Sequence, residues 1–90
     1  MEIQFSGIKL GKEEQGLVNG LIDHLISRGF EIESLNIELK ESKKAGGRSL
    51  YTTQLRVEAE SSLFSSEVTD WAMEKSLRAA FRKIEKEMKR

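Results

Sequence analysis

The sequence predicts an α+β fold, a two-layer α/β sandwich with two helices on one face of a mostly antiparallel sheet. Alternating apolar and polar residues mark half-buried strands, whereas two longer segments repeat their apolar residues every three to four positions, as amphipathic helices do. Each strand with clear alternation has one apolar and one polar face, so we expect helices to cover only one side of the sheet. With 90 residues, the chain is expected to form a single domain spanning residues 1–90.

The first strand is expected at the N-terminus, where Ile3 and Phe5 alternate with Glu2, Gln4 and Ser6. This period of two predicts that the two apolar side chains point to the covered face of the sheet. Glycines at positions 7 and 11 indicate a loop after the strand.

The first helix is predicted over residues 12–28, where apolar side chains recur three and four apart. Gly29 is expected to end it in the left-handed conformation, with Phe30 folding back over the last turn. Gly16 and Gly20 lie four residues apart, and we expect them to allow a close approach to the sheet. The apolar residues of the pattern are Leu17, Val18, Leu21, Ile22, Leu25 and Ile26.

Two central strands are predicted at residues 35–40 and 54–60, separated by a loop at residues 42–49. A turn near Ser61 and Ser62, followed by a short fourth strand, is only weakly indicated because no glycine or Asn-Gly pair fixes it. The first two strands are joined through a helix and can therefore lie parallel in a right-handed crossover. The remaining strands would be antiparallel.

The last helix is expected from about Glu67 to the C-terminus, with Ser66 as a candidate N-cap. Its apolar residues share one side of the helix: Met73, Leu77, Ala80, Phe81, Ile84 and Met88. The element order is therefore β-α-β-β-β-α, with four strands in the sheet, and the weakly indicated strand lies directly before the last helix.

The charge of the chain is unevenly distributed, although 15 basic and 15 acidic residues give a formal net charge of zero. Residues 40–48 and 75–90 hold eleven of the basic residues and three of the acidic ones. The net charge taken whole argues against a nucleic-acid binder, whose domain is usually basic. The charge of the separate segments, by contrast, predicts one loop and one helix that are strongly cationic.

Five cations of the last helix fall within an arc of about 80°, opposite the apolar side, at 100° per residue. A row of this kind suits phosphate binding, since each cation can displace a condensed counterion. Trp71 falls in the same arc and could stack on an unpaired base. The alternative is a solvated helix face whose cations are favoured by the macrodipole. The candidate residues are Lys75, Arg78, Arg82, Lys86, Lys89 and Trp71, with Lys43, Lys44 and Arg48 from the loop if it reaches the same surface.

Several classes of protein are disfavoured. The absence of cysteine, with one histidine in the chain, leaves too few ligands to predict a transition-metal site. No nucleophile motif, phosphate-binding glycine loop or calcium loop is present, so we expect neither an enzyme nor a bound cofactor. Apolar stretches are too short to cross a membrane, and no signal peptide is visible. We expect a cytoplasmic protein.

Four segments, residues 1–7, 35–40, 55–57 and 73–89, carry a family resemblance. They are similar to the three first strands and the last, partly basic helix of the short ribosome hibernation-promoting factor and ribosome-associated inhibitor family. The resemblance implies a β-α-β-β-β-α fold. It also implies binding to the small ribosomal subunit in the channel of tRNA and messenger RNA, and suppression of translation in stress or stationary phase.

The resemblance implies that the basic residues on the outer faces of both helices contact ribosomal RNA. The last helix carries such residues, but the first helix has Asn19, Gly20, Asp23 and His24 where the family is typically basic. The leading hypothesis is therefore a non-enzymatic, ribosome-associated, RNA-contacting factor.

Two alternatives remain open at this point. One is a protein-interaction module whose oppositely charged surfaces bind a protein partner or a second copy, without RNA. The other is a double-stranded RNA-binding domain, although its Lys-Lys-x-Ala-Lys helix start is missing here. Neither a membrane nor a small-molecule substrate is expected as a partner.

Overall fold

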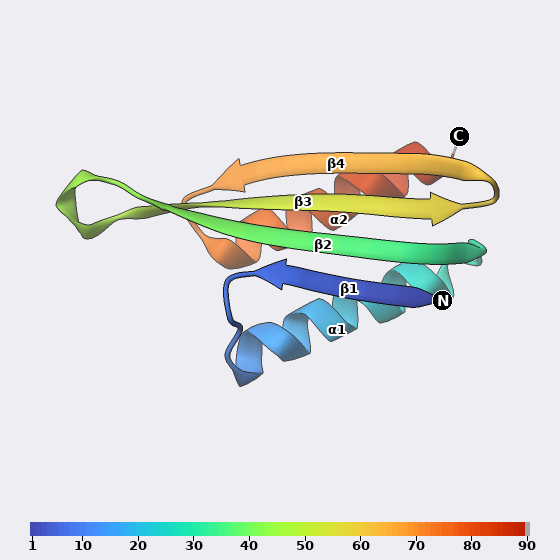
Figure 1. Ribbon diagram of the computed structural model, residues 1–90, viewed down its shortest axis with the longest axis horizontal. Helices are drawn as coiled ribbons and strands as arrows, with labels where there is room; N and C mark the ends of the chain where they lie inside the picture. Colours follow the sequence, from blue (N-terminus) through green and yellow to red (C-terminus); the bar gives the residue numbers. More distant parts are fainter. Residues whose placement is uncertain (90) are drawn as a thin grey trace.

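The computed structural model describes residues 1–89, and its two helices lie on one face of a four-stranded sheet (Figure 1). The strands lie in the order β1-β2-β3-β4, with β1 parallel to β2 and the other pairs antiparallel. The predicted α+β fold is therefore confirmed, including the fourth strand. The elements are β1 (Glu2–Gly7), α1 (Lys12–Ser27), β2 (Ile32–Lys43), a short 3-10 helix (Ala45–Gly47), β3 (Ser49–Ala59), β4 (Ser62–Asp70) and α2 (Met73–Met88).

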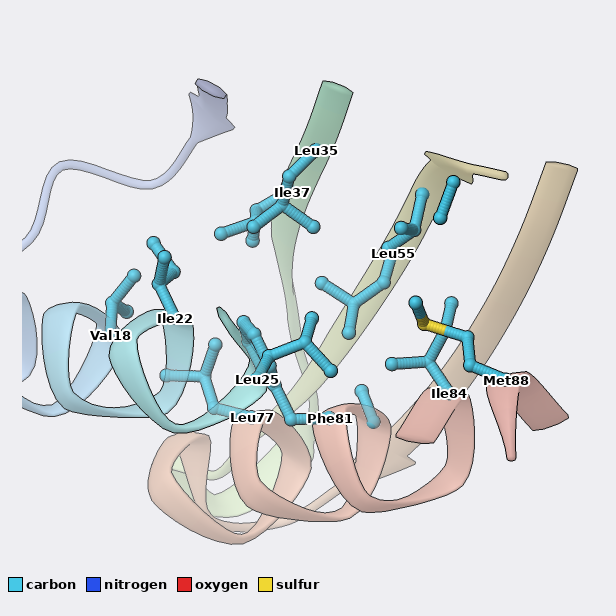
Figure 2. Packing of buried hydrophobic residues seen from close by; sticks show 13 residues of the cluster. Val18, Ile22, Leu25, Leu35, Ile37, Leu55, Leu77, Phe81, Ile84 and Met88 are labelled. Carbon is cyan, nitrogen blue, oxygen red and sulfur yellow. The ribbon is translucent and has the colours of Figure 1, made fainter. Parts of the chain in front are cut away.

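The core lies between the sheet and the helices, where apolar side chains of β2 and β3 meet those of α1 and α2 (Figure 2). The first helix contributes Val18, Ile22 and Leu25. The second contributes Leu77, Ala80, Phe81, Ile84 and Met88, and it also buries Ser76. No helix within residues 1–89 is long and apolar enough to cross a membrane.

The connection between α1 and β2 agrees with the sequence. The helix ends at Ser27, and Gly29 has a φ of 88°, in the left-handed region that glycine adopts at low cost. Phe30 is half-buried against the core cluster. The prediction for Gly16 and Gly20 is wrong, because both are exposed and nothing lies within 4 Å of a Cβ added at either.

Ile3 and Phe5 point to the helix side of the sheet, as the alternation predicts, because they pair with Leu35 and Ile37 of β2. They are nevertheless 45% and 38% exposed. Strand β1 is an edge strand, and the buried core contains no β1 residue. The alternation identified the strand correctly, but the helices do not cover its apolar side.

Strands β2 and β3 are longer than predicted and form a projecting hairpin arm (Figure 1). Their pairing continues to Lys43 and Ser49, beyond the end of β1 at Gly7 and of β4 at Asp70. The predicted loop at residues 42–49 is thus reduced to a tip, closed by a 2.7 Å hydrogen bond from the Lys44 amide to the Arg48 carbonyl.

The predicted start of the last helix is wrong. Residues 62–70 form β4, and α2 begins only at Met73. Ser66 is not an N-cap but a buried residue of β4, whose hydroxyl donates a 2.9 Å hydrogen bond to the Ala80 carbonyl. The helix also stops at Met88, and Arg90 lies outside the described residues.

Candidate nucleic-acid interface

Helix α2 presents its cations to solvent because its other side is buried against the sheet. Its buried residues lie on the side that faces β3 and β4, and the predicted arc of cations falls opposite them. All five predicted cations are exposed: Lys75, Arg78, Arg82 and Lys86 of α2, and Lys89 at its C-cap. Since each residue advances the helix by 1.5 Å, the row is about 21 Å long.

Two buried serines fix the rotation of α2 on the sheet. The Ser76 hydroxyl donates a 2.9 Å hydrogen bond to the Val68 carbonyl, so the Thr53 hydroxyl must donate the 2.9 Å bond that joins it to Ser76. Ser66 makes the second connection, to the Ala80 carbonyl. Buried hydrogen bonds of this kind tolerate little rotation, because an unpaired hydroxyl would then be buried. The cations are therefore held on the outer side.

The cations of α2 differ in their partners. Arg78 lies 3.4 Å from Glu74, and Lys89 lies 4.0 Å from Glu85. Glu85 also reaches across to α1, where it lies 2.8 Å from Arg28. These carboxylates neutralise part of the positive charge along the side of α2 next to α1.

Within residues 1–89, no ion pair engages Lys75, Arg82 or Lys86. Lys83 is a further exposed cation without such a partner, and the sequence analysis left it out. Its position about 80° from Lys75 on the helical wheel is the signal that could have identified it. These four residues, Lys75, Arg82, Lys83 and Lys86, are the free cations of α2.

Trp71 does not belong to the helical row. It lies between β4 and α2, where the Asp70 side chain accepts a 3.0 Å hydrogen bond from the Ala72 amide. Its ring therefore does not share the outer side of the helix with the cations. It faces the hairpin arm, where the Arg48 guanidinium carbon lies 4.0 Å from the ring centroid.

The hairpin arm leaves the sheet at the end where α2 begins (Figure 1). The contact between Arg48 and Trp71 therefore connects the arm to the start of the helix. Lys43 and Lys44 are exposed on the opposite side of the arm, Lys43 across from Ser49 and Lys44 across from Arg48. The structure thus joins the two cationic segments at Arg48, whereas the C-terminal cations of α2 lie at the opposite end of the helix.

The exposed face of α1 is not cationic. Asn19, Gly20, Asp23 and His24 are all exposed, and His24 lies 3.6 Å from Glu85. Residues 1–89 contain no group of three or more His, Cys, Asp or Glu side chains that could hold a metal ion. The outer face of the sheet forms a shallow hollow of about 730 Å³, lined by polar side chains such as Gln4, Asn36 and Glu67.

These features define a class: a four-stranded α+β domain whose second helix presents a cationic face. Two solved structures share the fold. A ribosomal subunit interface protein from Coxiella burnetii superposes with a TM-score of 0.80 at 16% identity, covering 99% of this chain and 94% of that one. The N-terminal domain of Thermus thermophilus Protein Y superposes with a TM-score of 0.74 at 15% identity, covering 98% and 92%.

Comparison of the sequence alone gives no further identification. No family model matches the chain, and no curated protein matches it. The fold that the family resemblance implies is thus confirmed over nearly the whole chain.

Proposed function

We propose that this chain is a ribosome-associated factor that binds the small ribosomal subunit and restrains translation in stress or stationary phase. The observation that carries the proposal is the row of free cations on α2, held outward on a fold shared with a ribosomal subunit interface protein. The likeness to this protein favours ribosome binding over the protein-interaction module. A ribosome-associated role places the chain in the cytoplasm.

The mechanism is electrostatic and needs no cofactor. Phosphates of ribosomal RNA would lie along α2, and each contact would release a condensed counterion. The free cations carry most of this energy, because Arg78 and Lys89 must first exchange a carboxylate for a phosphate. A domain bound in the channel used by tRNA and messenger RNA would exclude both by occupying their space.

The test is co-sedimentation with small subunits at roughly 50 and 200 mM salt. Five phosphate contacts give a slope of log affinity against log salt of about −3.5, so the wild type should lose about a hundredfold in affinity over this range. The variant Lys75→Glu/Arg82→Glu/Lys86→Glu should lose nearly all binding at both salt concentrations.

The matched control is Lys9→Glu/Lys12→Glu/Arg56→Glu, which makes the same change of charge at three exposed positions outside α2. It should keep most of its binding, because local contacts rather than net charge determine affinity. Equal losses in both variants would reject the interface, and self-association at low salt without RNA would support the protein-interaction module instead.

A further inference from the structure

The contact between Arg48 and Trp71 joins two segments that are remote in sequence and leaves an aromatic surface open. The guanidinium carbon lies 4.0 Å from the ring centroid, a distance at which the cation is attracted to the face of the indole. Nevertheless, 49% of the Trp71 surface is exposed. The exposed half of this residue gains nothing from burial in the folded chain alone, so it offers contact area to a partner.

The backbone at both residues is held by hydrogen bonds. The hydrogen bond from Ala72 to the Asp70 carboxylate fixes the turn that contains Trp71. On the other side, the Lys44 amide donates to the Arg48 carbonyl and fixes the base of the arm tip. With the backbone held in this way, the contact of the guanidinium with the indole places the two side chains together before any ligand arrives, which lowers the entropic cost of binding.

The charge around the pair suits an anionic ligand. Lys43 and Lys44 of the arm are exposed, and Arg48 has no ion pair within residues 1–89. Two carboxylates at this end of the molecule keep their charge but form no ion pair with these cations within residues 1–89: Glu41 accepts a 2.7 Å hydrogen bond from the Ser49 hydroxyl, and Asp70 accepts from Ala72. The arrangement thus combines an exposed aromatic side chain with unpaired cations.

We propose that Arg48 and Trp71 form a stacking platform for one unpaired base of an RNA, with Lys43 and Lys44 binding the adjacent phosphates. A base offers a flat π-face to the indole, whereas the lysines recognise the backbone without regard to sequence. Bases inside a duplex are stacked on their neighbours and cannot reach the ring. The platform therefore selects looped or single-stranded RNA.

This inference rests on the proposed function, since it specifies the kind of ribosomal RNA that the arm contacts while α2 follows the backbone. It assigns different tasks to the two cationic segments. The arm would recognise an unpaired nucleotide, and the helix would supply affinity that depends on charge alone.

The single tryptophan of the chain makes the platform directly observable by fluorescence. Oligo(A), whose purine ring system overlaps well with indole, is titrated against the wild type beside an RNA duplex of equal charge. Quenching of Trp71 is expected with oligo(A) and not with the duplex. Quenching by both to the same extent would overturn the proposal.

Variants then separate stacking from charge, with affinity measured by the anisotropy of labelled oligo(A). Trp71→Ala should weaken binding roughly 5- to 150-fold, the range expected for loss of one stacked base, and Trp71→Phe should recover part of it. Arg48→Lys should also weaken binding, because an ammonium keeps the charge but not the planar surface. The matched control Phe5→Ala removes another exposed aromatic side chain, from β1, and should bind as the wild type does.

Wild-type affinity of Trp71→Ala for oligo(A) would reject the platform. The proposed function can be rejected independently of the platform. If Trp71→Ala binds oligo(A) normally while the α2 charge reversal abolishes subunit binding, only the platform is wrong. If oligo(A) quenches Trp71 and small subunits do not bind the chain, the platform stands and the ribosomal target is wrong.

Discussion

The two helices have equal length, 16 residues each, and lie on the same face of the sheet, yet they differ in both burial and charge. Helix α1 buries three residues, all aliphatic, whereas α2 buries six and adds hydrogen bonds to β3 and β4 through Ser66 and Ser76. The exposed side of α1 is nearly free of cations, and that of α2 carries a row of them. A helix that must hold charged groups in a fixed direction needs the firmer attachment, and α2 has it.

The firmer attachment of α2 to the sheet leads to the largest expected effect, a loss of unfolding free energy. Ile84 of α2 is fully buried and Ile22 of α1 is 7% exposed, so the same substitution can be made in both helices. Removing a buried Ile side chain costs about 2–5 kcal/mol through lost transfer energy and a residual cavity. We expect Ile84→Ala near the upper end of this range and Ile22→Ala near the lower end, measured by urea unfolding.

The urea slope should be the same in both variants, which shows that the unfolded states are comparable. If Ile22→Ala costs as much as Ile84→Ala, the two helices are equally well attached, and the contrast between them concerns charge alone.

This contrast also shows where the sequence was informative. The fold class could be predicted from two patterns: the period of two in β2 and β3, and the three-to-four-residue apolar period in both helices. Both patterns arise because one face of each element is buried. Strand β4 was only weakly indicated for a physical reason. Its inward side runs through Phe64, Ser66 and Val68, and the serine in the middle is a polar residue whose burial depends on its hydrogen bond to Ala80. The preceding turn has no glycine, although Glu60 and Ser61 both adopt a positive φ, 51° and 64°.

The candidate site was likewise only partly predictable from the sequence. Helical periodicity predicted that five cations share one side of α2, because that depends only on local geometry. The contact of Arg48 with Trp71 depends on how far β2 and β3 continue to pair, here to Lys43 and Ser49. Pairing length is a tertiary property, and no local pattern in residues 42–49 encodes it.

The difference in charge can be tested by making α1 resemble α2. Asn19 and Asp23 are exposed and lie one turn apart on α1, so Asn19→Lys/Asp23→Lys adds two cations to one side. If α1 also faces ribosomal RNA, affinity for small subunits should rise on the order of tenfold at low salt, and the salt slope should steepen by about 1.4. Co-sedimentation at two salt concentrations measures both.

The matched control for this graft is Glu2→Lys/Gln4→Lys, which adds the same charge to exposed positions of β1. It should change affinity much less than the graft. Equal gains in both variants would mean that net charge, and not the side of the molecule that faces the subunit, controls binding.

The smallest effect concerns Gly20, which is exposed on α1 with nothing within 4 Å of an added Cβ. Gly20→Ala should raise the free energy of unfolding by about 0.5–1 kcal/mol, because glycine loses more backbone entropy than alanine in a helix. Gly7→Ala provides the contrast, since Gly7 has a φ of 104° and its added Cβ would lie 2.0 Å from the Leu39 carbonyl oxygen. That variant should be destabilised, and both are measured by urea unfolding.

Gly20→Ala also distinguishes two ways in which α1 could take part in binding. If α1 contributes no contact, the variant should be more stable and bind small subunits as the wild type does. A loss of subunit binding in a protein that has gained stability would mean that the bare backbone at Gly20 approaches the RNA closely, as glycine allows. In that case α1 would bind through the absence of side chains, and the two helices would differ in how they contact RNA rather than in whether they do.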